Sequence, residues 1–160
     1  FNGSNSYLDA GNAAAVQLGS TLTLEAWVNP TNSSGLGNII QKNQNSGYRF
    51  RISNGDLWAY SSGNSVTTSG SPCANGTWCH CVATFGPSGL VVYVNGVALA
   101  SNSTAYSPAN VAAGNLQIGC YTPGSETFNG SISVARVYNR VLSAAEVAQN
   151  FNATRGRYGI

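Results

Sequence analysis

Residues 77–99, TWCHCVATFGPSGLVVYVNGVAL, constrain the fold of this chain more than any other segment. Two runs rich in β-branched and aromatic residues flank Gly-Pro-Ser-Gly at 86–89, a sequence that favours a tight reversal. The second run ends at Asn95-Gly96, a dipeptide typical of type I′ hairpin turns, and residues 97–99 then continue in an extended pattern. The segment therefore predicts three successive antiparallel strands, a meander around which the other strands are arranged.

The remaining strands are predicted from alternating apolar and polar residues. Residues 22–28, LTLEAWV, alternate strictly and predict a half-buried strand. Residues 48–52 and 57–60 predict a second hairpin, with Arg49 and Arg51 on its exposed side. Shorter strands are expected at 7–11, 38–42, 116–120 and 132–138, with a weak strand at 65–68.

A single helix is expected near the end of the chain. Ser143 and Glu146 form a capping box, which predicts a helix from Ala144 to about Asn150. Residues 155–160, RGRYGI, are expected to form a flexible or docking tail. Many short strands with one late helix predict an all-β fold, a two-sheet antiparallel sandwich.

The length of 160 residues predicts one domain spanning 1–160. A net charge of +2 without a Lys/Arg run gives no electrostatic basis for binding nucleic acid. No apolar stretch is long enough for membrane insertion. Because the sequence contains no Met and starts at Phe1, it is expected to be a processed chain or one module of a longer protein.

Four cysteines, in a chain with one lysine and many Asn, Ser and Thr residues, favour an oxidising, extracellular compartment. The Cys-His-Cys run at 79–81 lacks the second Cys/His pair of a zinc knuckle, so disulfides are favoured over a metal. In a strand, Cys79 and Cys81 share a face with Cα atoms about 6.5–7 Å apart, at or beyond the bridging limit. Each is therefore expected to pair with Cys73 or Cys120. Of the two connectivities left, Cys73–Cys79 with Cys81–Cys120 is favoured because its first bond closes a short, turn-prone loop.

Residues 128–151, FNGSISVARVYNRVLSAAEVAQNF, closely resemble the terminal signature of laminin-G-like, concanavalin A-like lectin/glucanase jelly rolls. That signature is Phe-x-Gly, an alternating strand, Tyr-Asn-Arg-x-Leu-Ser and a short Ala/Glu helix. Three further segments match in the expected order, at 1–11, 22–30 and 77–99. The resemblance therefore covers nearly the whole chain.

The resemblance implies a two-sheet jelly roll, often secreted and often one module of an adhesive, carbohydrate-active or viral structural protein. The motifs that carry it are packing and turn residues, so they specify the fold rather than the function. Family members commonly have His and an aliphatic residue where this chain has Cys79 and Cys81. These two cysteines are therefore interpreted as a local, structural addition.

The sequence shows no catalytic constellation. Glucanases of this fold carry two or three carboxylates at alternating positions of one strand. The acidic residues of this chain are instead isolated in sequence, at Asp9, Glu25, Asp56, Glu126 and Glu146. His80 has no accompanying Ser or Cys nucleophile motif. We therefore predict that the protein is not an enzyme.

Family members often hold one calcium ion in a rim loop, which implies a candidate site here. The tetrapeptide Phe-Asn-Gly-Ser occurs at 1–4 and again at 128–131, so the first and last strands are expected to be neighbours. That arrangement would bring together Asp9 and Glu126, with Asn12 as a third oxygen donor. Calcium prefers six to eight oxygens, so the ion would be weakly bound or structural, and no cofactor is expected to be required. The alternative is that both acids are solvated loop residues.

Sugar binding needs exposed aromatic faces beside amide and hydroxyl groups. Trp58 and Tyr60 share one face of a predicted strand, and they are the main candidates. The further candidates lie near this strand or in loops: Asn54, Asp56, Tyr106 and Tyr121. The alternative is that Trp58 belongs to the core of the sandwich.

The predicted function is that of a non-catalytic extracellular recognition or adhesion module of the lectin type, with glycans as partners. The alternative is a structural or decoration subunit of a virion, filament or surface layer, bound to neighbouring protein subunits. Six Asn-X-Ser/Thr sequons agree with a secreted glycoprotein, although chance yields several in so Asn-rich a chain. These sequons start at Asn2, Asn32, Asn75, Asn102, Asn129 and Asn152.

Overall fold

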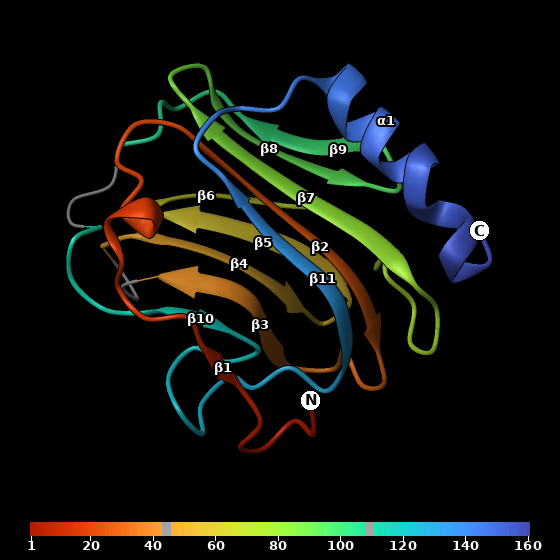
Figure 1. Ribbon diagram of the computed structural model, residues 1–160. Coiled ribbons are helices and arrows are strands. Elements are labelled where there is room, and N and C mark those ends of the chain that lie inside the picture. Colours follow the sequence, from red (N-terminus) through yellow and green to blue (C-terminus); the bar gives the residue numbers. More distant parts are fainter. Residues whose placement is uncertain (43–45, 108–110) are drawn as a thin grey trace.

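Figure 1 shows a computed structural model of the chain, which describes residues 1–42, 46–107 and 111–160. The strands in these residues are β1 (Leu8–Asp9), β2 (Leu22–Pro30), β3 (Leu36–Lys42), β4 (Tyr48–Ser53), β5 (Asp56–Ser61), β6 (Asn64–Thr67), β7 (Cys79–Gly86), β8 (Gly89–Val94), β9 (Val97–Asn102), β10 (Leu116–Ile118) and β11 (Gly130–Tyr138). The helices are the α-helix α1 (Ala144–Thr154) and the 3₁₀ helices η1 (Ala14–Val16) and η2 (Arg155–Tyr158).

The strands form two antiparallel sheets that pack face to face (Figure 1). One sheet has six strands in the order β1-β10-β3-β4-β5-β6, and the other has five in the order β11-β2-β7-β8-β9. The predicted meander is β7, β8 and β9, joined by the turn at 86–89 and by Asn95-Gly96, whose φ angles are 49° and 84°. The predicted all-β sandwich is therefore confirmed.

Alternation along the strands places one face of each sheet in the core. Residues 22, 24, 26 and 28 of β2 belong to the apolar cluster between the sheets. Alternate residues of β4 and β5 join it, namely Tyr48, Phe50, Ile52, Leu57 and Ala59. The intervening side chains of β4 and β5 consequently point to the outer face of the six-stranded sheet.

The outer face of β2 is also buried, so the prediction of a half-buried strand is wrong. Thr23, Glu25 and Trp27 are all 0% exposed, because α1 and η2 cover this side of the five-stranded sheet. The Trp27 indole Nε1 donates to Thr154 Oγ1 at 3.0 Å, and its ring stacks on the ring of Tyr158 with centroids 3.9 Å apart. Of the two alternatives expected for residues 155–160, a flexible tail is wrong and the tail is instead docked, since Tyr158 of η2 packs against Trp27.

A buried carboxylate joins α1 to three strands. Glu25 accepts hydrogen bonds from Arg136 Nη1 (2.7 Å), Tyr138 Oη (2.6 Å) and Asn150 Nδ2 (3.0 Å), and His80 Nε2 lies 3.1 Å from it. Burial alone would raise the pKa of Glu25. The hydrogen bonds from His80 and Tyr138 and the charges of His80 and Arg136 outweigh burial and lower this pKa to about 2. Glu25 is therefore held as an anion within a structural network.

Two local predictions are confirmed near the chain ends. The capping box forms with both of its bonds, since Ser143 accepts from the Glu146 amide and Glu146 accepts from the Ser143 amide, although α1 extends to Thr154. The two Phe-Asn-Gly-Ser segments are neighbours, because Asn2 forms a β-bridge with Asn129. The expectation that the first and last strands are neighbours is wrong, since β1 pairs with β10 in one sheet and β11 pairs with β2 in the other. Among the described residues, α1 and the shorter helices do not have the length or hydropathy to cross a membrane.

Candidate functional site

The outer face of the six-stranded sheet carries a row of aromatic and cationic side chains. In the β4–β5 hairpin, Arg49 pairs with Tyr60 and Arg51 pairs with Trp58. Because their neighbours along each strand face the core, these four side chains project together on the outer side. Tyr121 and Glu126, from the loop after β10, lie over the same face. We call these six residues the aromatic–arginine cluster.

The aromatic pair in the cluster is stacked and partly exposed. The rings of Trp58 and Tyr60 have centroids 5.1 Å apart and an interplanar angle of 28°. Both residues are intermediate in exposure, so neither is a core residue. The alternative that Trp58 belongs to the core is therefore wrong.

Two guanidinium groups lie against these rings. Arg51 Cζ is 3.8 Å from the Trp58 ring centroid. Arg49 Cζ is 4.8 Å from the Trp58 centroid, 5.3 Å from that of Tyr60 and 4.7 Å from that of Tyr121. At these distances both cations interact with the aromatic faces. The cluster is thus a stack of aromatic rings and guanidinium groups, in which Arg51 lies over the Trp58 ring.

Glu126 is the carboxylate of the cluster. Its Oε2 lies 3.1 Å from Arg51 Nη1 and 3.6 Å from Arg49 Nη1, and it accepts from Asn38 Nδ2 at 2.8 Å. The side chains of Arg49 and Arg51 are only 8% and 15% exposed, so the prediction that they are exposed is wrong. Both arginine side chains lie flat on the sheet because they stack on the aromatic rings and form ion pairs with Glu126.

Spare donor capacity remains on both arginines. Among the described residues, the buried Nε atoms of Arg49 and Arg51 have no hydrogen-bond acceptor. Burial lowers the pKa of Arg49 and the Arg51 charge adds to this, while the Glu126 charge opposes it. An arginine nevertheless stays cationic at neutral pH. Two cations against one carboxylate leave the cluster with a net positive charge.

Of the other predicted sugar-binding residues, only Tyr121 joins the cluster. Asn54 and Asp56 act within the loops, since Asn54 Oδ1 accepts from the Gly35 amide and Asp56 Oδ1 from the Ser71 amide, both at 2.9 Å. Tyr106 is 6% exposed and packs edge-on against Phe85 in the core. The prediction that Tyr106 contacts a ligand is therefore wrong.

The predicted calcium ligands are not brought together. Asp9 accepts from the Gly11 amide and from Asn115 Nδ2, and its pKa is lowered by the Asn115 bond and then by the Gly11 bond. Asn12 Oδ1 instead accepts from Lys42 Nζ. The Glu126 carboxylate is engaged by the two arginines of the cluster. These three side chains therefore share no common pocket for an ion.

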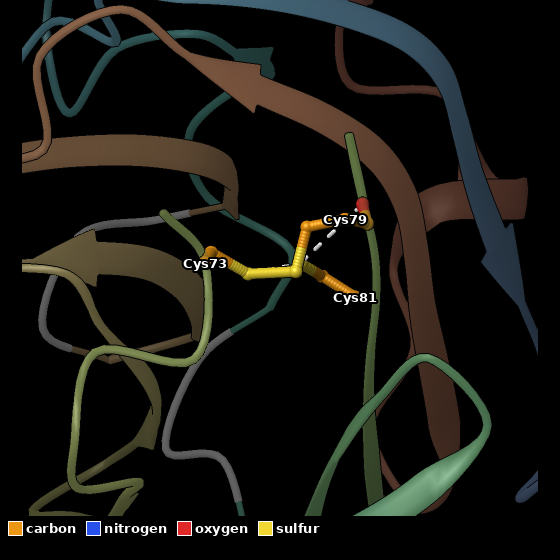
Figure 2. A group of neighbouring side chains, drawn as sticks. All are labelled: Cys73, Cys79 and Cys81. Atoms are coloured by element: carbon orange, nitrogen blue, oxygen red, sulfur yellow. Dashed lines mark hydrogen bonds between the residues drawn. A yellow bond between two sulfur atoms is a disulfide. The ribbon is translucent and has the colours of Figure 1, made fainter. Parts of the chain in front are cut away.

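The cysteine prediction is confirmed for one bond and wrong for the other (Figure 2). Cys73 and Cys79 form a disulfide, whereas Cys81 and Cys120 are buried free thiols. Cys81 instead lies beside the disulfide, with its Sγ 3.5 Å from Cys73 Sγ. Cys120 follows β10 of the opposite sheet. Burial raises the pKa of its thiol, and the negative charge of Asp9 raises this pKa further.

The six sequon asparagines differ in accessibility. Asn2, Asn32, Asn75 and Asn152 are exposed, whereas Asn102 and Asn129 are partly buried. The amide Nδ2 of Asn102 donates to Asn64 Oδ1 and to the Ser65 carbonyl, both at 2.8 Å, and Asn2 Nδ2 donates to Asn5. A glycan is attached through this nitrogen, so the positions best suited to carry one are Asn32, Asn75 and Asn152.

The sequence analysis missed the role of the arginines and of Glu126 in this site. The sequence did contain enough information to place Arg51 beside Trp58. A tight turn at Asn54-Gly55 fixes the register of the hairpin and pairs these two residues. Glu126 lies in the loop after β10, more than seventy residues after the arginines that it contacts. Its residue type and spacing give no indication of that contact.

Comparison with known proteins places this geometry in context. The family described as the Concanavalin A-like lectin/glucanases superfamily matches residues 2–148. No curated protein sequence matches the chain. Among solved structures, the Ruminococcus gnavus IT-sialidase CBM40, bound to α2,3-sialyllactose, has a TM-score of 0.77 and 15% identity. That match covers 92% of this chain and 93% of the other.

Two further matches involve longer chains. A Bacteroides ovatus ATCC 8483 protein has a TM-score of 0.76 and 19% identity, over 92% of this chain and 45% of its own. The ligand binding domain of botulinum neurotoxin serotype D, in complex with N-acetylneuraminic acid, has a TM-score of 0.71 and 15% identity, over 94% of this chain and 41% of its own. This chain thus spans less than half of either. At these identities the likeness shows the shared fold, the predicted jelly-roll sandwich.

Proposed function

The chain belongs to the concanavalin A-like lectin/glucanases superfamily, and we propose that it is a non-catalytic, extracellular glycan-binding domain that binds at the aromatic–arginine cluster. The observation that carries the proposal is the partly exposed, stacked pair of Trp58 and Tyr60, against which the guanidinium groups of Arg49 and Arg51 pack. The disulfide between Cys73 and Cys79 supports the extracellular setting.

The chemistry of the cluster suits a sugar that bears a carboxylate. The apolar C–H face of a pyranose packs on an aromatic ring, and guanidinium N–H groups donate charge-assisted hydrogen bonds to a carboxylate. The CBM40 bound to sialyllactose and the neurotoxin domain bound to N-acetylneuraminic acid share this fold and bind such sugars. Their ligands support the class of sugar that we propose.

The same geometry supports a binding role over a catalytic one. Most glycoside hydrolases place two carboxylates across the scissile bond. Among the described residues, the cluster contains one carboxylate, Glu126, and two arginines already engage it. Glu25 is fully buried beneath α1, so it is inaccessible to a polysaccharide.

Substitution of Trp58 by alanine is expected to weaken glycan binding by about tenfold or more, because it removes the ring on which the sugar stacks. A glycan array with the disulfide-intact protein, with calcium and again with a chelator, identifies the ligand, and calorimetry then gives its affinity. Trp78, a partly buried residue that precedes β7 of the other sheet and contacts Tyr158 of η2, provides the matched control. Equal losses in Trp58→Ala and Trp78→Ala would contradict the proposed site.

Acidic glycans are expected to bind about tenfold more tightly than their neutral counterparts, with α2,3-sialyllactose against lactose as the test pair. Substitution of Glu126 by glutamine should raise the affinity for the acidic sugar by about two- to fivefold, because it removes the carboxylate that competes for Arg51. Arg51→Gln should lower it. A fall in affinity in Glu126→Gln would show that Glu126 supports the ligand rather than competing with it.

A structural role is the second candidate, favoured by one observation at the edge of the five-stranded sheet. The edge strand β9 exposes Val97 (60%) and Leu99 (47%), and exposed apolar edges promote pairing between chains. Light scattering at increasing protein concentration tests this role. Assembly that Val97→Lys and Leu99→Lys abolish, together with a silent glycan array, would favour a building unit over a lectin.

A further inference from the structure

Three cysteine sulfur atoms converge in the core, beneath the meander. Cys79 and Cys81 are two residues apart on β7, so their side chains share its inner face, and Cys73 reaches them from the preceding loop (Figure 2). The three Sγ atoms all lie within 4.8 Å of one another, and those of Cys73 and Cys81 are 3.5 Å apart. The three residues are at most 2% exposed.

These separations suit coordination of a single ion. With metal–sulfur bonds of about 2.3 Å in tetrahedral geometry, neighbouring thiolates lie about 3.8 Å apart. The third sulfur, on Cys81, already lies at this range from Cys73. Reduction cleaves the bond between Cys73 and Cys79 and provides the other two thiols. A dithiol supplies the two electrons and two protons and becomes a disulfide, whereas a phosphine supplies the electrons and becomes the phosphine oxide, with oxygen and protons from water.

We propose that the reduced protein binds one thiophilic metal ion through the three sulfur atoms of Cys73, Cys79 and Cys81. On binding, the ion displaces the thiol protons to solvent, and three metal–sulfur bonds form. Thiolates select soft ions of the Zn²⁺, Cd²⁺ and Cu⁺ type over Ca²⁺ and Mg²⁺. Oxidation to the disulfide removes two of the three ligands, so the site exists only under reducing conditions.

The coordination sphere is left open at one position. Among the described residues, the three cysteines are joined by no further His, Cys, Asp or Glu. His80 lies between two of them in sequence but on the opposite face of β7, where it contacts Glu25. A small external ligand, such as water or a thiol, would therefore complete a tetrahedral site.

The test uses Cd²⁺ with the full chain in the Cys120→Ser background, reduced by a phosphine without oxygen. Ultraviolet charge-transfer absorption should saturate at one ion per chain. Cys81→Ser should lower the affinity about 100-fold, whereas Cys120→Ser alone should leave it unchanged. Because each thiol must lose its proton to bind the ion, the affinity should also increase with pH.

Thermal unfolding provides a second readout, since reduction alone destabilises the fold. Cd²⁺ should raise the melting temperature of the reduced protein by several degrees and have no effect on the oxidised protein or on Cys81→Ser. The proposal is overturned if Cys81→Ser binds as tightly as its parent, if Cys120→Ser weakens binding as much as Cys81→Ser does, or if Cd²⁺ leaves the reduced protein no more stable.

Discussion

Replacing Glu25 with alanine is expected to lower the free energy of unfolding by about 4 kcal/mol, the range found when one partner of a buried ion pair is removed. The loss leaves the buried His80 and the hydroxyl of Tyr138 without their acceptor and removes one of the two hydrogen bonds by which Asn150 of α1 contacts the sheet. Urea denaturation at neutral pH measures the change. The same substitution at Glu146, a capping residue with an ion pair to Arg140 at the surface, should cost much less, because water screens this pair.

Unfolding measured at decreasing pH distinguishes the contribution of the Glu25 charge to stability from that of its size and shape. The pKa of Glu25 is about 2 in the folded protein against an ordinary value of 4.5, so the unfolded chain takes up this proton more readily. The resulting stabilisation, about 3 kcal/mol, is fully present above pH 4.5 and is lost as the pH falls toward 2. The difference in stability between the wild type and Glu25→Gln should therefore shrink over this interval. A difference that stays constant would show that the charge of Glu25 contributes nothing.

Local sequence patterns were sufficient for the architecture. A hairpin turn, a capping box and an alternating strand are each specified within a few residues, because turn conformation and side-chain direction are local properties. The meander at 77–99 and the helix start at Ala144 were predicted for this reason. The repeated tetrapeptide correctly predicted that its two copies are neighbours, as the bridge between Asn2 and Asn129 shows, although β1 and β11 lie in different sheets.

The second covered face of β2 could not be predicted in this way. The alternating pattern predicts that Thr23, Glu25 and Trp27 face solvent. Alternation shows that the two faces of a strand differ in polarity, but it does not show which other elements cover each face. The cover is α1 and η2, more than a hundred residues later, and Trp27 contacts both Thr154 and Tyr158. A buried carboxylate is stable there because four side chains surround it.

In the candidate site too, local sequence patterns predicted some residues, whereas tertiary contacts determine the others. Trp58 and Tyr60 were found because they share a strand face, which is a local feature. Their partners come from the register of β4 and from the loop that carries Tyr121 and Glu126, so the site is completed by tertiary contacts. The predicted bond between Cys81 and Cys120 was wrong for a related reason. Sequence spacing left Cys120 as the remaining partner, yet it follows β10 of the other sheet, and the Cys81 Sγ lies instead 3.5 Å from the Cys73 Sγ.

Substitution of Gly89 by alanine is expected to destabilise the protein by about 4 kcal/mol or more, because the backbone around Gly89 leaves no space for a methyl group. Gly89 begins β8 with a φ of 116°, in a region that other residues rarely adopt. A Cβ atom there would lie 1.9 Å from the carbonyl oxygen of Asn102 and 2.8 Å from the Cα of Ser103. Both are backbone atoms at the end of β9, so the clash could be relieved only by separating β8 from β9.

Gly124→Ala provides the matched control, because it changes the backbone conformation without the clash. Gly124 also has a positive φ, 78°, but no atom lies within 4 Å of the Cβ position. The expected cost is about 1 kcal/mol, the price of a left-handed conformation alone. Thermal and urea unfolding of both variants give the comparison. An equal loss of stability in Gly89→Ala and Gly124→Ala would contradict this prediction. It would mean that the turn at 86–89 packs less closely against β9 than this structure shows, and that the meander does not hold β9 at the edge of the sheet.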